Sequence, residues 1–237
     1  MAIKYLIFFI IAISACLTIV KLKKLTSIGS IIGFTIALSV FSAFGFQGLA
    51  ILATFFLTAS LATSWKASEK QNNFSLINQP VTRDAFQVFA NGGVASICSL
   101  LFIFLPNYQE YWLLMMAASF SSATADTISS ELGTVYGTKF FNILTFKLDT
   151  KGENGVISFE GLLFGLAGST IIATVFSFGF GFDFRFLIIL TAGTIGNLAD
   201  SLLGATLERN KSLNNNQVNF LNTFIAATSV LLFFCGL

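Results

Sequence analysis

The chain has 237 residues, of which 55% are hydrophobic and 10% are charged, and its formal net charge is +2. Soluble domains carry about 25% charged residues, so this composition indicates an integral membrane protein. The small net charge gives no basic surface for nucleic acid, and the absence of histidine excludes histidine as a base, nucleophile or zinc ligand. The three cysteines, Cys16, Cys98 and Cys235, lie far apart in apolar runs, so neither a disulfide nor a zinc site is predicted.

Apolar runs long enough to cross a bilayer, which takes about 20 residues each, recur along the whole chain. We predict an all-α polytopic protein with a single transmembrane domain over residues 1–237. The first run is too long for the core of a signal peptide, so we keep it as a span. Residues 28–65 are too long for one span, and Gly45-Phe46-Gln47-Gly48 is expected to divide them as a hairpin. The eight expected spans are 3–20, 28–44, 47–65, 86–105, 111–131, 158–180, 185–207 and 217–236.

The distribution of lysine and arginine predicts the orientation, because positive charge is retained on the cytoplasmic side. Eleven of the thirteen basic residues fall on one side of the membrane when both termini face outward. Loops 66–85, 132–157 and 208–216 are therefore expected in the cytoplasm, and we expect the chain in a bacterial inner membrane. The sequence leaves open whether the chain forms a homo-oligomer.

Two acidic residues lie inside predicted spans, where an unpaired charge is costly. Asp126 and Asp200 are each 15 residues into a span that runs inward, a depth of about 22 Å at the helical rise. Asn91, Asn219 and Asn222 reach a similar depth on spans that run the other way. We therefore predict a shared site at the cytoplasmic end, with structural hydrogen bonding between helices as the alternative.

Glu131 ends the same span as Asp126, but a separation of five residues places it about 140° around the helix. The two side chains cannot bind one ion unless the helix unwinds locally. Glu131 is therefore expected either to serve a second ion or to pair with a loop lysine.

The loop "KLDTKGENGVISFEG" (147–161) carries two lysines and a Gly-x-Asn-Gly element just before a predicted span. Glycines let backbone N–H groups surround an anion, and a helix N-terminus favours phosphate. The alternative is a plain turn at Asn154-Gly155. No Gly-x(4)-Gly-Lys-[Ser/Thr] motif is present, so a P-loop is excluded. Carboxylates, lysines and an Asn-Gly loop suit phosphoryl transfer, in which Mg²⁺ takes one or two carboxylates and phosphate oxygens.

Six segments, in the same order along the chain, together resemble the integral-membrane phytyl-phosphate kinase family of the vitamin E pathway. That family is distantly similar to the CTP-using polyprenol and dolichol kinases. The loop departs from the family's usual "GTNGG", with Glu153 where threonine is common and Val156 where a second glycine is common. The segments are "FFLTASLATSWKASEK" (55–70), "TRDAFQVFANGG" (82–93), "ADTISSELG" (125–133), "KGENGVISFEG" (151–161), "GNLADSLLGATLE" (196–208) and "NNQVNFLNT" (215–223).

The resemblance implies phosphoryl transfer from a nucleoside triphosphate, CTP or a similar donor, to a prenyl monophosphate at the cytoplasmic membrane face. We expect three groups of site residues. The catalytic and magnesium-binding residues would be Asp126, Glu131 and Asp200. The nucleotide would be bound by Ser130, Lys147, Lys151, Asn154, Gly155, Ser201 and Asn219. The prenyl phosphate would be bound by Lys70, Arg83, Asn91 and Asn222.

Three other functions compete with this hypothesis. A transporter or flippase for a phosphorylated lipid would place its polar residues near the bilayer midplane, often on broken helices, whereas these lie towards one side and the spans look continuous. A CDP-alcohol phosphotransferase would need the pattern Asp-Gly-x2-Ala-Arg-x8-Gly-x3-Asp-x3-Asp, which no stretch supplies. A purely structural membrane protein is the third alternative.

Overall fold

The computed structural model describes residues 2–71 and 82–234. Part of the expected loop 66–85, the last residues of the final expected span and Cys235 lie outside the described residues.

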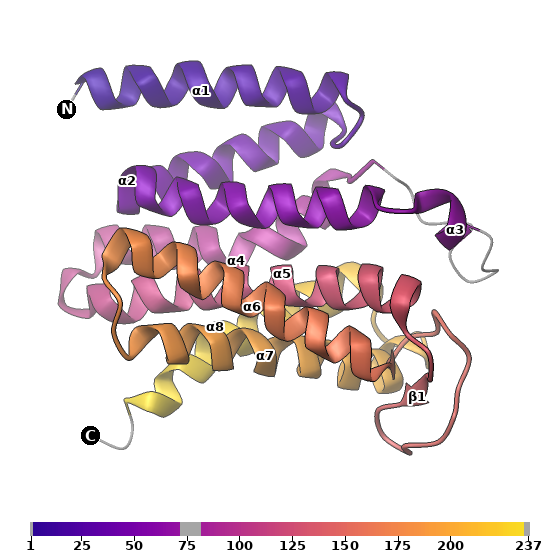
Figure 1. Ribbon diagram of the computed structural model, residues 1–237. Coiled ribbons are helices and arrows are strands. Elements are labelled where there is room, and N and C mark those ends of the chain that lie inside the picture. Colours follow the sequence, from indigo (N-terminus) through magenta and orange to yellow (C-terminus); the bar gives the residue numbers. More distant parts are fainter. Residues whose placement is uncertain (1, 72–81, 235–237) are drawn as a thin grey trace.

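The described chain is a bundle of long helices, and a longer loop, 137–158, joins α5 to α6 (Figure 1). The long helices are α1 (Ala2–Lys21), α2 (Ser27–Ser64), α4 (Ala85–Phe104), α5 (Gln109–Tyr136), α6 (Phe159–Phe180), α7 (Arg185–Leu203) and α8 (Asn215–Ser229). The shorter elements are α3 (Ala67–Gln71), the 3-10 helices η1 (Pro106–Tyr108) and η3 (Val230–Phe233), and the π-helical η2 (Gly204–Glu208). Strands β1 (Phe141–Asn142) and β2 (Val156–Ile157) pair antiparallel in the loop before α6.

The architecture confirms the prediction of an all-α polytopic membrane protein. Within residues 2–71 and 82–234, five helices are long and apolar enough to cross a membrane: α1, α2, α4, α6 and the continuous stretch Arg185–Glu208. With 15 residues, α8 is shorter than the others. The number of spans and the outward termini stay predictions.

The stretch assigned to α2 is two helices that meet at a turn, as the sequence predicts. Gly45 has φ 62° and ψ −147°, a conformation that residues with a Cβ rarely adopt. A continuous helix of 38 residues would be about 57 Å long. Instead, Lys24, just before its start, donates a hydrogen bond to Ser64 at its end. The chain therefore reverses at Gly45, and Figure 1 shows the two halves of α2 running back along each other.

The central helix is α5, which packs against α2, α4, α6, α7 and α8. Every residue from Leu113 to Ala125 is buried, including the serines of this run. Small side chains allow neighbouring helices to approach closely, and such packing replaces the hydrophobic effect between helices in a membrane. This central position brings α5 into contact with five other helices.

The helix ends at the predicted cytoplasmic side are capped by side chains. Asp84 and Gln87 form a capping box at the start of α4, and Asn214 and Gln217 form a second one at the start of α8. Such caps satisfy N–H groups that the helix leaves without partners. They fix where α4 and α8 begin, and hence where Asn91 and the polar residues of α8 lie.

We expect single cysteines at Thr150 and Asn214, placed in a cysteine-free background, to react with a membrane-impermeant maleimide only after the cells are permeabilised. The physical reason is the excess of positive charge in these loops. Cysteines at Asn107 and Asp183, at the opposite ends of the helices, serve as controls and should react in intact cells. Labelling at position 150 or 214 in intact cells would show that these loops face outward, opposite to the predicted orientation.

Candidate functional site

A polar cavity of about 260 Å³ opens at the end of the bundle where α5, α7 and the loop before α6 meet. Its wall comes from several parts of the chain that are distant in sequence. Residues that line it include Thr63, Arg83, Gln87, Asn91, Asp126, Ser129, Ser130, Glu131, Asn154, Gly155, Asn197, Asp200, Ser201, Glu208, Asn215 and Asn219. The predicted convergence of carboxylates and amides at one end of the bundle therefore occurs in the structure.

The centre of this cavity is a pair of carboxyl groups. Asp126 on α5 and Asp200 on α7 both line the cavity, and their carboxyl groups are close enough to interact with each other. Asn222 on α8 donates a hydrogen bond to Asp200, from Nδ2 to Oδ1 at 2.7 Å. Asn222 in turn accepts one from Ser122 of α5 at 3.1 Å. This chain of contacts connects three helices and fixes the direction in which the Asp200 carboxylate points.

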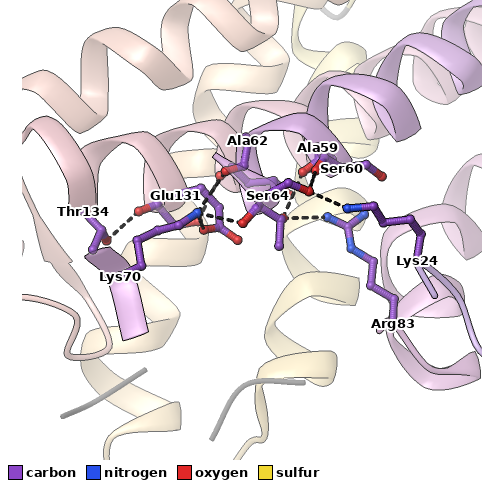
Figure 2. Close-up of polar contacts among 12 residues, drawn as sticks. Lys24, Ala59, Ser60, Ala62, Ser64, Lys70, Arg83, Glu131 and Thr134 are labelled. Carbon is purple, nitrogen blue, oxygen red and sulfur yellow. Dashed lines mark hydrogen bonds and ion pairs between the residues drawn. The ribbon is translucent and has the colours of Figure 1, made fainter. Parts of the chain in front are cut away.

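Glu131 lies at the edge of the cavity and is engaged by Lys70 of α3 (Figure 2). The two charged groups are 2.6 Å apart, and the side chain of Lys70 is 8% exposed while that of Glu131 is 23% exposed. Lys70 Nζ also donates to the carbonyl oxygens of Ala62 and Thr63, each at 2.9 Å. An ammonium group has three N–H donors, and all three are used. Lys70 therefore anchors α3 and Glu131, and it has no donor left for the prenyl phosphate that the sequence assigns to it.

Arg83, two residues before the start of α4, places a positive charge in the cavity wall. Its guanidinium donates to Thr63 Oγ1 at 3.4 Å. Burial lowers the pKa of Arg83, and the nearby carboxylates of Glu131 and Asp126 oppose that shift. Arginine keeps its charge even so, which makes Arg83 a cation facing an acidic cavity.

The loop between α5 and α6 covers the cavity and is held against the end of α7. Gly155, at φ 72°, approaches so closely that a Cβ there would lie 2.3 Å from Ala205. Arg209 donates to the Asn154 carbonyl oxygen at 2.6 Å and pairs with Asp149 at 2.8 Å. The Thr150 backbone N–H and the Arg209 guanidinium hold the pKa of Asp149 below its usual range. The loop is therefore fixed by contacts within the protein.

The structure separates some of the predicted residues from the cavity. Lys147 is exposed, between the two strands, and Lys151 Nζ lies 5.5 Å from the centre of the Phe140 ring. Neither contributes to the cavity wall. Asn222 is fully buried and bound to Asp200 and Ser122, so it positions a carboxylate and cannot contact a prenyl phosphate.

Sequence reasoning missed two contributors to the site. Gln87 lies one helical turn before Asn91 and lines the same wall, which the spacing of four residues could have revealed. Arg209 fixes the loop from a distant part of the chain, and no local signal marks that contact. The sequence also predicts one continuous α-helix over 185–207. In the structure the last residues form the π-helix η2, and Glu208 at its end lines the cavity.

The donor set fits a magnesium ion at the aspartate pair. Mg²⁺ is bound in proteins by one or two carboxylates and completes its shell with water and phosphate oxygens. Asp126 and Asp200 supply two adjacent carboxylates in a cavity with further amide and hydroxyl oxygens. Among the described residues, no group of three or more acidic or cysteine side chains is close enough to hold an ion. Glu131 is committed to Lys70, so the expected third protein ligand is not brought to the pair.

Breaking the Lys70–Glu131 pair should destabilise the protein, because each partner would leave the other with an unsatisfied charge. We expect Lys70→Met and Glu131→Gln each to lower the free energy of unfolding by roughly 1.5–3 kcal/mol. The exposed pair Lys66–Glu69, whose side chains are 40% and 60% exposed, is the matched control, and Lys66→Met should cost less than about 1 kcal/mol. Thermal unfolding in detergent, followed by circular dichroism, measures both. Equal losses at the two pairs would contradict a structural role for Lys70.

Comparison with known proteins places the chain among integral membrane proteins. It is 34% identical over 194 residues to an uncharacterized membrane protein of Methanocaldococcus jannaschii, covering 81% of this chain and 79% of the relative. It is 31% identical over 222 residues to an uncharacterized membrane protein of Synechocystis, covering 92% and 85%.

A plant relative extends the comparison. The chain is 27% identical over 215 residues to Protein VTE6, chloroplastic, of Arabidopsis thaliana, covering 88% of this chain and 65% of the plant protein. The match therefore spans less than two thirds of the length of that relative. No solved structure matches the chain at a significant level. The profile of the family described as integral membrane protein DUF92 matches residues 10–227, and the chain belongs to this family.

Proposed function

We propose that the protein is a prenyl-phosphate kinase that transfers a phosphoryl group from a nucleoside triphosphate, CTP or a similar donor, to a prenyl monophosphate. The observation that carries the proposal is the contact between Asp126 and Asp200 in a polar cavity at one end of a membrane bundle. The six segments that resemble the phytyl-phosphate kinase family support the same reaction, and the chain is also similar to the plant protein VTE6 over most of its length. We further propose that the site faces the cytoplasm, where the nucleotide is available.

The proposed roles of the residues follow from their places in the cavity. Asp126 and Asp200 would hold Mg²⁺, which when bound neutralises charge on the phosphates. Backbone N–H groups of the loop at Asn154-Gly155, which lines the same cavity, would contact the nucleotide phosphates. Hydroxyl and amide groups of Ser130, Ser201 and Asn219 also line this cavity.

Arg83 and Asn91 are proposed to bind the prenyl phosphate. An arginine binds phosphate through two parallel N–H donors, which fixes orientation as well as charge. An oxygen of the prenyl phosphate forms a new bond to the terminal phosphorus of the nucleotide. The bond between that phosphorus and its bridging oxygen breaks, and the nucleoside diphosphate leaves with the electron pair. The attacking oxygen is already ionised near neutral pH, so no side chain needs to act as a base.

The position of the polar residues argues against the transport alternative. Transporters bind substrates near the bilayer midplane, between repeats that rock against each other. Here the cavity is closed on one side by the loop before α6 and lies where the helices end. The turn at Gly45 lies between the two helices of α2, and η2 lies at the end of α7, so neither interrupts the middle of a span.

Asp126→Asn and Asp200→Asn should each abolish turnover, because an amide keeps the size of the side chain but does not bind Mg²⁺ as a carboxylate does. Both variants should purify as monodisperse species with unchanged helix content. Asp183→Asn, in the loop at the other end of the bundle, is the matched control and should keep wild-type activity. The assay measures nucleoside diphosphate release with a panel of radiolabelled nucleotides and prenyl monophosphates. Magnesium-dependent turnover in either site variant would rule out that aspartate as a ligand.

Replacement of Arg83 tests the lipid-phosphate assignment. Arg83→Met keeps much of the side-chain volume and removes a charged contact worth roughly 1.5–3 kcal/mol in total, so the KM for prenyl monophosphate should rise about 10- to 150-fold. The KM for nucleotide should change little. A rise confined to the KM for nucleotide would show that Arg83 binds the nucleotide instead.

A further inference from the structure

A second cavity, of about 740 Å³, lies beside the polar one, between α1, both halves of α2 and the start of α4. Its wall is formed almost entirely by apolar side chains, among them Phe8, Ala12, Phe34, Ile36, Leu52 and Phe56. The volume falls within the range of about 300–1,000 Å³ that is usual for ligand pockets. Its apolar side chains take no part in the phosphoryl transfer.

The two cavities meet at one place. Arg83, Gln87 and Asn91 line both of them. Lys24 also lines the apolar cavity, where it donates to Ser64 at the inner end of α2. One end of the second cavity is therefore lined by polar and cationic side chains, and that end opens towards the aspartate pair.

The rest of the apolar cavity is long and ends at a cluster of aromatic rings. On α1 it is lined by residues from Phe8 to Leu22, a distance of about 21 Å at 1.5 Å per residue. At the far end Phe8 stacks on Phe41, with 4.5 Å between ring centres. Phe8, Ala12 and Phe41 form a small buried cluster there. A ligand in this space would have a head at the polar junction and a long apolar chain ending near Phe8.

We infer that this cavity binds the prenyl chain of the lipid phosphate and limits its length, an inference that rests on the proposed function. The headgroup would lie at Arg83 and Asn91, and the chain would extend between α1 and α2 towards Phe8. The occupant is an isoprenoid chain rather than a compact solute, because the apolar wall extends over about two thirds of a hydrocarbon core that is about 30 Å thick.

The position of α1 gives such a lipid a route from the bilayer. Figure 1 shows α1 at the edge of the bundle, beside α2. Only 6% of its most apolar 18-residue stretch is buried inside the protein, which makes α1 the least buried of the candidate spans. It is held mainly by the cluster at Phe8 and Phe41, near the far end of the cavity. The inner half of α1 therefore borders both the cavity and the surrounding lipid.

Shortening the cavity should change the preferred chain length. Ala53, on the second half of α2, lines the apolar cavity in its outer part. Ala53→Phe should lower the ratio of kcat/KM for geranylgeranyl over geranyl monophosphate by about tenfold, the equivalent of two buried methylene groups. The KM for nucleotide should not change. Ala50→Phe is the matched control, since Ala50 is exposed on the same half of α2 and does not line the cavity, and it should leave the ratio unchanged.

A cross-linking experiment separates this inference from the proposed function. Geranylgeranyl monophosphate with a diazirine at the chain end is bound to the wild-type protein, irradiated, and the modified residues are mapped by mass spectrometry. Modification within 8–15 or 49–56, at the far end of the cavity, supports the inference whether or not turnover occurs. Modification spread over the lipid-facing surfaces of α6 and α7 overturns it, as does an unchanged chain-length ratio in an active Ala53→Phe variant. If the wild type phosphorylates no prenyl phosphate, the proposed function fails instead.

Discussion

The contact between the Asp126 and Asp200 carboxyl groups is the interaction on which the rest of the site depends. Two carboxylates on membrane helices are costly unless they face water, a cation or polar partners. The structure meets this requirement with a polar cavity on one side and the Asn222 amide on the other. Asn222 also accepts a hydrogen bond from Ser122, so residues of α5, α7 and α8 together hold the Asp200 carboxylate in place. A bound cation would remove the remaining repulsion.

Lys70, beside the cavity, and Arg83, in its wall, have separate roles that their residue types explain. Lys70 is a compact charge, and its three donors are consumed by Glu131 and two carbonyl oxygens (Figure 2). Arg83 has five donors in a planar group, so it can contact Thr63 and still present N–H groups to the cavity. The buried lysine therefore stabilises the fold, whereas the arginine stands where the polar and apolar cavities meet.

Most of the fold could be predicted from local pattern. Apolar runs of about 20 residues define membrane helices because an exposed backbone cannot be tolerated in lipid. The expected spans 86–105 and 158–180 agree with α4 and α6 to within a residue at each end. Gly45 could be predicted as a turn because its stretch was too long for one span. The convergence of Asp126, Asp200 and Asn91 followed from depth, which the constant helical rise fixes.

By itself the sequence determined the membrane class, the helices and the depth of the polar residues, since each depends on a residue and its near neighbours. Only the tertiary structure decided which groups meet. Lys70 and Glu131 are separated by 61 positions, and Arg209 and Asn154 by 55. The same holds for the joining of the two cavities at Arg83, Gln87 and Asn91, which depends on how the α2 hairpin packs against α4. Rotation of helices about their axes and the path of loops are set by packing, and that information is spread over the whole chain.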